Sequence, residues 1–107
     1  MCIRDRCIPN DGSIDGLRND DVVEITCDVD KNGCTPHRIG KADEQNLELI
    51  RRVKNYERLS SKAIRERSRS AAIQALTLHP LVNSYSIAVK LVDEFIEHNK
   101  NYCGGWK

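Results

Sequence analysis

The segment Val22–Asp30 limits the fold more than any other part of the sequence. Its nine residues, VVEITCDVD, alternate between apolar and polar. A period of two places alternate side chains on opposite faces of an extended strand. The apolar positions are Val23, Ile25, Cys27 and Val29. The sequence therefore predicts a half-buried strand with one apolar face.

The residues after this strand predict a hairpin. Asn32-Gly33 is typical of a tight turn between antiparallel strands. Residues 34–39 are then expected to return beside the first strand, and Pro36, which lacks a backbone N–H, limits the return to an edge or a very short pairing. Residues 7–14 are expected to form a short extended piece, in which Asn10-Asp11-Gly12 is a further turn signal.

After Gly40 the apolar period becomes helical. A first helix is predicted over about residues 42–66, with a bend near Ser60-Ser61, and a shorter one over about residues 68–78. A last helix is predicted from a cap at Ser84 or Ser86 to about Tyr102. The order of elements predicts an α+β fold, with short antiparallel strands or a hairpin followed by three helices.

The last predicted helix has one apolar stripe, which must be buried somewhere because an uncovered stripe favours aggregation. Gly104-Gly105 is expected to cap the end of this helix. The stripe consists of Ala88, Leu91, Val92, Phe95 and Ile96. We therefore expect the chain to self-associate or to be only marginally stable.

Size and charge exclude several classes of protein. A chain of 107 residues forms at most one small domain, and a net charge of +1 gives no global attraction to nucleic acid or to an anionic membrane. The longest apolar runs are far shorter than the roughly 20 residues of a membrane-spanning helix. Met1–Pro9 lacks the apolar region of a signal peptide. We expect a cytoplasmic protein with no nucleic-acid or membrane partner.

The cysteines indicate free thiols in a reducing compartment. There are five of them, an odd number, and no pair has CxxC spacing. Cys27 and Cys34 flank the predicted turn, so a disulfide between them remains an alternative.

Asp28-Val29-Asp30-Lys31-Asn32-Gly33 matches the first half of a calcium-binding loop. Such a loop needs a bidentate Glu at its twelfth position and an entering helix, whereas Ile39 stands at that position and a strand precedes the loop. A solvated hairpin turn is the favoured interpretation, with calcium binding as the weaker alternative.

The first predicted helix and the residues after it are basic, which would suit phosphate binding. The cations are Arg51, Arg52, Lys54, Arg58, Lys62, Arg65, Arg67 and Arg69. Glu48, Glu57 and Glu66 are interleaved with them, so a solvated or inter-subunit face is favoured over a nucleic-acid face.

The histidines form no metal-ligand pair with each other or with a cysteine. His79 precedes Pro80 at a predicted helix end, where a structural capping role is expected. The sequence also contains no glycine-rich phosphate loop, nucleophile elbow or HExxH motif. Taken alone, the chain offers no catalytic constellation.

Four segments in order resemble the C-terminal domain of glycoside hydrolase family four. They are Asn10-Asp11-Gly12-Ser13-Ile14 with Gly16-Leu17, Val22-Val23-Glu24-Ile25 running to Gly33, Tyr56-Glu57-Arg58-Leu59, and Leu76–Val82 followed by Ala88 to Asn99. The last helix and Tyr102 most resemble the 6-phospho-β-glucosidase branch. The resemblance assigns residues 7–107 to this domain and leaves Met1–Arg6 as a leader outside the family, of artificial origin on this interpretation.

The resemblance implies a parent enzyme with a Rossmann-type domain upstream and an architecture like that of lactate and malate dehydrogenases. It implies NAD and a divalent metal, usually manganese, a phosphorylated glycoside substrate and a homo-oligomer. In this family NAD transiently oxidises the sugar, a tyrosine removes the acidified proton, and the glycosidic oxygen is eliminated.

None of the family's catalytic, cofactor-binding or metal-binding motifs can be placed in this chain. The metal role is not transferred to Cys27 or His37, and the base role is not transferred to Tyr56. The chain alone is therefore expected neither to hydrolyse phospho-glycosides nor to bind NAD or metal. The alternative is a stand-alone helical interaction module without enzymatic activity.

Overall fold

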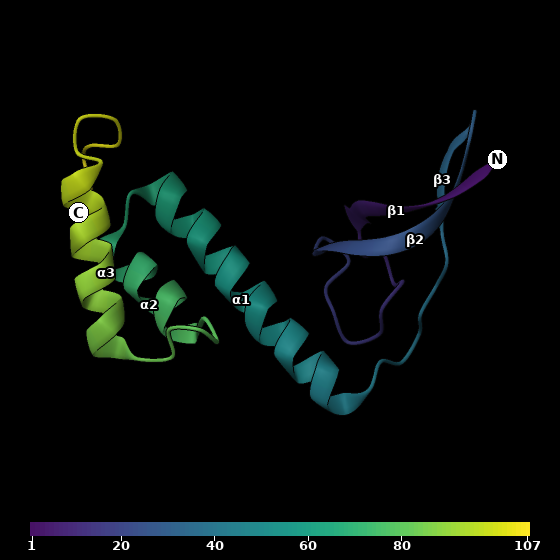
Figure 1. The fold of residues 1–107 in the computed structure, drawn as a ribbon, viewed down its shortest axis with the longest axis horizontal. Coiled ribbons are helices and arrows are strands. Elements are labelled where there is room, and N and C mark those ends of the chain that lie inside the picture. Colours follow the sequence, from purple (N-terminus) through teal and green to yellow (C-terminus); the bar gives the residue numbers. More distant parts are fainter. The chain divides into compact units, whose positions relative to one another are not determined.

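The computed structural model describes residues 1–107, in which three strands precede three helices (Figure 1). The strands are β1 (Cys2–Pro9), β2 (Val22–Asp30) and β3 (Gly33–Pro36), and the helices are α1 (Glu44–Glu66), α2 (Arg69–Leu78) and α3 (Tyr85–His98). The α+β prediction is confirmed. The chain divides into two compact units, Met1–Glu48 and Leu49–Lys107, called unit 1 and unit 2 below and described separately.

Unit 1 is built on an antiparallel sheet in the order β1-β2-β3. The alternation in β2 is confirmed, because Val23, Ile25 and Cys27 are buried while Glu24 is exposed. The partly buried residues around this core are Ile8, Ile14, Leu17 and Val29. The apolar face of β2 thus packs under side chains from β1 and from the loop that joins β1 to β2.

The predicted hairpin is confirmed, but its turn residues are Lys31 and Asn32, because Gly33 already belongs to β3 and pairs with Asp30. Its turn is held by the backbone N–H of Asn32, which donates to Oδ1 of Asp30 at 2.7 Å. β3 ends at Pro36, as the missing proline N–H requires. The register places Cys34 opposite Val29 and Cys27 opposite Pro36, so the two cysteines are not directly paired. All five cysteines are free thiols.

β1 is longer than expected, because it begins at Cys2 and not at Cys7. Residues 2–6 pair with residues 25–29 of β2. Most side chains of β1 are exposed, so burial imposes no apolar alternation on this strand and the sequence shows none. The backbone pairing says nothing of the origin of Met1–Arg6, which stays a prediction.

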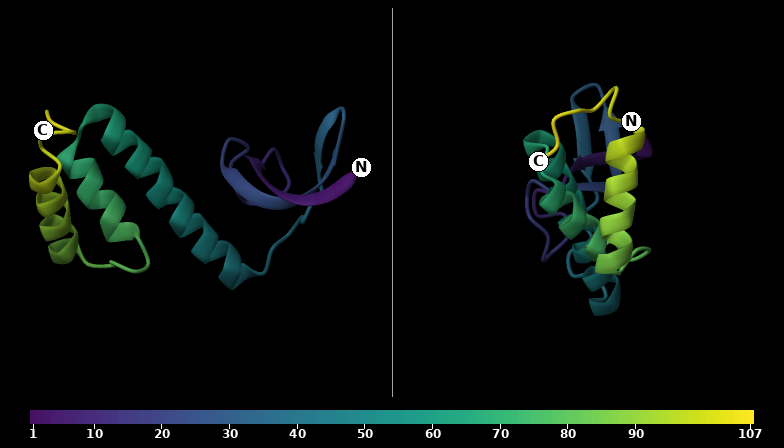
Figure 2. Two further views of the ribbon diagram at one scale, coloured as in Figure 1. Left: turned by 45° about the horizontal axis from the view of Figure 1, so that its top comes forward. Right: turned by 90° about the vertical axis from the view of Figure 1, so that its left-hand side faces the viewer.

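The core of unit 2 lies between α2 and α3, which run side by side in both views of Figure 2. Its buried residues are Ile73, Ala88 and Val92. α1 continues through Ser60-Ser61 as one helix, and Ala63 is its buried residue. The apolar face of α1 is therefore much less buried than its amphipathic sequence predicts.

Serine side chains cap α2 and α3. Ser68 Oγ accepts from the N–H of Ala71 at 3.2 Å, and Ser84 Oγ accepts from the N–H of Ile87 at 3.4 Å. The predicted cap at Ser84 is thus confirmed. Both serines have extended backbones, as N-cap residues typically do.

The predicted end of the last helix is wrong. α3 ends at His98, with Asn99 as its C-cap, so Gly104-Gly105 lies beyond the helix. The Nδ2 atom of Asn99 donates to the carbonyl of Phe95 at 2.8 Å, and a turn follows in which the N–H of Cys103 donates to the carbonyl of Asn99. Asparagine side chains compete in this way with helical backbone bonds, which explains the early stop.

The C-terminal residues turn back onto the junction between α1 and α2. The N–H of Lys107 donates to the carbonyl of Arg67 at 2.8 Å, and the N–H of Arg69 donates to the carbonyl of Lys107 at 2.8 Å. The guanidinium of Arg67 donates to the carbonyl of Gly104 at 2.7 Å. These bonds fix residues 104–107 on unit 2. None of the helices has the length and apolar character needed to cross a membrane.

Candidate functional site

A buried asparagine organises the loop between β1 and β2. Asn10 Oδ1 accepts from the N–H of Ile14 at 2.8 Å, and its Nδ2 donates to the carbonyl of Ile14 at 3.1 Å and towards that of Leu17 at 3.5 Å. The backbone N–H of Asn10 donates to the carbonyl of Asp21 at 2.7 Å. The hydrogen bonds of Asn10 therefore hold this loop in shape, in place of the backbone bonds of a helix or strand.

Two further polar residues are buried in the same loop. Asp21 Oδ2 accepts from the N–H of Arg18 at 3.0 Å, which closes the end of the loop before β2. Ser13 Oγ is buried without a hydrogen-bond partner. Its backbone carbonyl accepts from the N–H groups of Ile39 and Gly40 and so ties the loop to the chain after β3. The polar groups of Asn10 and Asp21, and the backbone carbonyl of Ser13, thus hold the loop in shape.

Unit 2 carries an apolar groove of about 300 Å³. Its walls come from α1, α2, α3 and the C-terminal residues. They consist of Tyr56, Ser60, Ala63, Ile64, Ala72, Ala75, Leu76, Val92, Phe95, Ile96, Asn99, Cys103 and Trp106. With no cation and no carboxylate in its lining, the groove suits apolar side chains and not a phosphorylated sugar.

The groove corrects one expectation about α3. Ala88 and Val92 are buried, as the apolar stripe predicts, but Phe95 is half-exposed at the groove. Ile64 on α1 is likewise exposed. The stripe is therefore covered on the side that faces α2 and open on the side that faces the groove.

The half-match to a calcium loop is part of the hairpin. Asp28 and Asp30 lie in β2, and Asp28 Oδ2 is 3.0 Å from Nε2 of His37. The side chain of Asp30 is used to hold the turn. These contacts support the hairpin interpretation over a calcium loop, in which both carboxylates would bind one ion.

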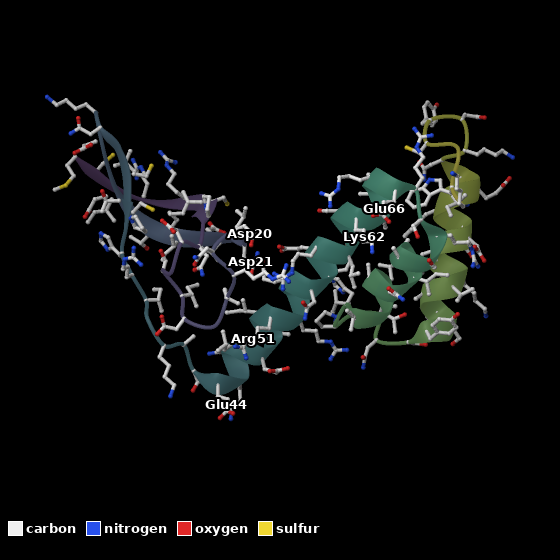
Figure 3. The ribbon with its side chains drawn as sticks, turned by 180° about the vertical axis from the view of Figure 1, so that it is seen from behind. Asp20, Asp21, Glu44, Arg51, Lys62 and Glu66 are labelled. Atoms are coloured by element: carbon white, nitrogen blue, oxygen red, sulfur yellow. The ribbon has the colours of Figure 1, made fainter.

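The basic residues of α1 and its neighbours largely bind groups of unit 2. Arg52 donates through Nε to the carbonyl of Leu78 at 2.7 Å and through Nη2 to Oδ1 of Asn83. Lys54 pairs with Glu57 at 2.8 Å. Figure 3 shows Arg51, Lys62 and Glu66 at separate points along α1, so basic and acidic groups share the helix. The arrangement supports a solvated helix face and not a phosphate-tracking one.

Arg69 and Asp93 join the start of α2 to α3. Their side chains meet through Nε–Oδ1 at 2.7 Å and Nη2–Oδ2 at 2.9 Å. This paired hydrogen bond lowers the pKa of the Asp93 carboxyl and raises the pKa of the Arg69 guanidinium. The contact braces the helices.

His79 has a structural role, but the expected capping of last-turn carbonyls by its side chain is wrong. His79 is the C-cap residue of α2, and its Nδ1 accepts from the N–H of Leu81 at 3.2 Å. The imidazole thus supports the turn after the helix and not the last carbonyls of the helix. Its ring also packs edge-on against the ring of Tyr56, with centroids 4.6 Å apart. The family segments around Tyr56 and His79 therefore meet as packing residues.

The residues present do not fit a metal ion or NAD. No three side chains of His, Cys, Asp or Glu come together as a metal-binding group. Burial, followed by the nearby thiol of Cys34, raises the pKa of the Cys27 thiol and disfavours the thiolate that a metal requires. A dinucleotide needs a strand, a glycine loop and a helix in sequence, whereas Gly33 lies in a hairpin between antiparallel strands.

The fold and the sequence together identify the family. The model of the family 4 glycosyl hydrolase C-terminal domain matches residues 6–82. The chain belongs to glycosyl hydrolase family 4, and the resemblance inferred from its four ordered segments is confirmed.

Two relatives and one solved structure illustrate the match. The 6-phospho-beta-glucosidase BglT of Thermotoga maritima is 40% identical over 93 residues, which are 87% of this chain and 22% of the relative. The maltose-6'-phosphate glucosidase MalH of Clostridium acetobutylicum is 37% identical over 95 residues, which are 89% of this chain and 22% of the relative. A crystal structure of a 6-phospho-alpha-glucosidase from gut microorganisms, in complex with NAD and Mn²⁺, is 28% identical and has a TM-score of 0.93 over 99% of this chain and 24% of that chain. The chain thus spans about a fifth of the length of these relatives.

The sequence did not reveal the apolar groove or the central role of Asn10. The groove depends on how far α1 stands from α2 and α3, which no local pattern encodes. For Asn10 there was a signal, since an Asn-Asp-Gly turn beside a strand often uses the asparagine side chain to bond the backbone.

Proposed function

We propose that this chain is the C-terminal part of an NAD- and divalent-metal-dependent 6-phospho-β-glucosidase, which hydrolyses O-glycosidic bonds of phosphorylated disaccharides. The chain contributes scaffold to that enzyme, while the catalytic, cofactor and metal groups belong to the upstream part. The family match over residues 6–82 carries the proposal. The NAD and Mn²⁺ named for the related crystal structure support the two cofactors.

The β specificity is supported by the relative from Thermotoga maritima, which is 40% identical to this chain. A 6-phospho-α-glucosidase is the second candidate, because the related structure with a TM-score of 0.93 bears that name. The two activities differ at the anomeric carbon, which reacts in the part of the enzyme upstream of this chain.

A hybrid enzyme tests the scaffold role. Residues 7–107 would replace the corresponding C-terminal segment of the Thermotoga maritima enzyme, and activity would be measured with chromogenic aryl 6-phospho-β- and 6-phospho-α-glucosides in the presence of NAD and Mn²⁺. We expect a folded hybrid that cleaves the β substrate. A folded hybrid without NAD-dependent activity on either substrate would contradict the proposal.

The isolated chain is the matched control for this assay. We expect it to release no chromophore and to bind no NAD, because it has no nucleotide-binding unit. NAD-dependent hydrolysis by the isolated chain would overturn the assignment of the chemistry to the upstream part.

Three further proposals accompany this function. We propose that the parent is cytoplasmic, which the five free cysteines support, and that the chain forms homo-oligomers. We also propose that residues 7–107 are the family domain and that Met1–Arg6 lies outside it; the family match begins at residue 6, close to this boundary. The genomic sequence upstream of Cys7 tests this last point: an in-frame glycine loop after a strand is expected, and a stop codon there would contradict it.

A further inference from the structure

We propose that residues 104–107, called the strap below, fix the position of α1 against α3, with Arg67 fastening the strap and Trp106 packing in the wall of the apolar groove. The inference goes beyond the proposed function and does not depend on it, because it concerns only contacts within unit 2. α1 needs such support, since α2 and α3 share a buried core whereas Ala63 is the buried residue of α1.

The first observation is the backbone at the corner between α1 and α2. Arg67 has φ +50°, in the left-handed region. The N–H of Ser68 donates to the carbonyl of Ala63 at 2.9 Å, and the N–H of Arg67 donates to that of Ile64 at 3.4 Å. These two bonds form a Schellman motif, in which glycine usually holds the left-handed position. Because glycine would adopt this conformation without strain, the arginine is explained by what its side chain binds.

The second observation is that the strap is bound at both ends to this corner. Nη1 of Arg67 donates to the carbonyl of Gly104 at 2.7 Å. At the other end, the N–H of Lys107 donates to the carbonyl of Arg67 and the N–H of Arg69 donates to the carbonyl of Lys107, both at 2.8 Å. The chain turns between these anchors at Gly105, which has φ +80°. The strap thus crosses from the end of α3 to the end of α1 (Figure 2, right).

The third observation is the place of Trp106, which lies between the two anchors. Its side chain lines the groove together with Ile64 of α1 and with Phe95 and Ile96 of α3. Trp106 is partly buried, whereas Tyr102, just before the strap, is 87% exposed. A tryptophan can bury about 150–250 Å² of surface. Packing of this one side chain against residues of α1 and α3 therefore sets the spacing of the two helices.

The test uses the full chain, with amide hydrogen exchange of the three helices and emission of the single tryptophan as the two measurements. Arg67→Gly suits the left-handed backbone and removes only the side chain that binds Gly104. Trp106→Ala removes the indole, and Trp106→Phe keeps an aromatic ring in its place. Circular dichroism of each variant verifies the fold.

The controls are matched to these variants. Arg65→Ala removes an exposed cation from the last turn of α1, next to the corner. Tyr102→Ala removes an aromatic ring from the same C-terminal segment, at a residue that is not part of the groove wall. We expect both controls to keep the amide protection and the tryptophan emission of the wild type.

In Arg67→Gly we expect tryptophan emission to shift to the red and protection of the α1 amides of residues 60–66 to fall about tenfold or more. Protection of the core amides of α2 and α3 should stay equal or rise, because glycine relieves the strain at the corner. Trp106→Ala should produce the same selective loss in α1, and Trp106→Phe should restore most of it. A loss confined to α1 separates positioning of this helix from general stabilisation of unit 2.

Three results would overturn the proposal. Unchanged tryptophan emission in Arg67→Gly would show that Arg67 does not fasten the strap. Unchanged α1 protection in Trp106→Ala, or in an Arg67→Gly variant whose emission has shifted, would show that the strap does not position α1. Equal losses in all three helices would make the strap a general stabiliser. Arg67→Gly decides the question even where Trp106→Ala does not fold, and none of these results bears on the hybrid-enzyme test.

Discussion

Replacing Asn10 by alanine should unfold unit 1 at a much lower denaturant concentration. The Asn10 side chain is 0% exposed and makes close hydrogen bonds of 2.8 and 3.1 Å to the backbone of Ile14. Each such bond contributes about 0.5–1.5 kcal/mol net, and a buried backbone group left unpaired costs about 1–3 kcal/mol. Asn10→Ala removes both bonds and leaves the N–H and carbonyl of Ile14 unpaired. We expect a loss of about 2–4 kcal/mol.

Amide hydrogen exchange measures this loss in unit 1 specifically, because the only tryptophan lies in unit 2. Since about 1.4 kcal/mol is a tenfold change, protection of the β2 amides should fall about 30- to 700-fold. Asn19→Ala is the control, the same change at an exposed position of the same loop. Equal protection in wild type and Asn10→Ala would refute the idea that this side chain supports the loop.

Three further changes test unit 2. Phe95→Ala should cost only about 1 kcal/mol because Phe95 is half-exposed, whereas buried Ile73→Ala should cost about 3 kcal/mol in denaturant unfolding. The bond to Arg69 lowers the pKa of Asp93 below its usual value of 3.8. The stabilisation of the folded state by this bond is therefore fully present above pH 3.8 and is lost as the pH falls through the lower folded-state pKa. Asp93→Asn should flatten the acid dependence of the unfolding midpoint. Gly105→Ala should loosen the C-terminal residues and shift tryptophan emission to the red, since Gly105 has φ +80°, a backbone conformation that is strained for a residue with a Cβ.

Each of these changes has a matched control in the chain. Gly104→Ala should leave tryptophan emission unchanged, because its Cβ would meet the nearest atom at 3.5 Å, an ordinary contact. Glu94→Gln, the same type of change next to Asp93, should keep the acid dependence of the wild type. A costly Phe95→Ala, an unchanged pH profile in Asp93→Asn, or equal emission in both glycine variants would contradict the corresponding prediction.

The elements with a strong local signal were predictable from the sequence. The alternation of apolar and polar residues predicted where β2 begins and ends, because one face of the strand is buried and the other is not. α2 and α3 begin where Ser68 and Ser84 can cap them, since a serine hydroxyl satisfies an N–H that the first turn leaves unpaired. The hairpin of β2 and β3 was predictable from its turn residues, but its register was not: Asp30 pairs with Gly33, so the turn residues are Lys31 and Asn32 and not Asn32-Gly33.

The features without a local signal were not predictable. β1 extends to Cys2 through backbone pairing, and because its side chains are mostly exposed, the strand needs no apolar alternation that the sequence could show. The exposure of Ile64 and Phe95 depends on the distance of α1 from the other helices, while the sequence specifies only which face of each helix is apolar. The early end of α3 reflects a competition at Asn99 between side-chain and backbone donors, in which local propensity does not decide the outcome.

The residues that reveal the family carry little information about substrate specificity, because of the roles that they have in the fold. Asn10 supports a loop, Val23 and Ile25 form a core, and Tyr56 packs against His79. Each of these landmarks has a packing or loop-supporting role in this structure. Relatives with different named activities can therefore be 40% and 37% identical to this chain over 93 and 95 aligned residues, since a common scaffold keeps the same packing while the bond that is cleaved changes elsewhere. We propose that the anomeric preference of the parent enzyme is encoded outside this chain, and the hybrid enzyme tests this, because it would retain the upstream sequence of the Thermotoga maritima protein.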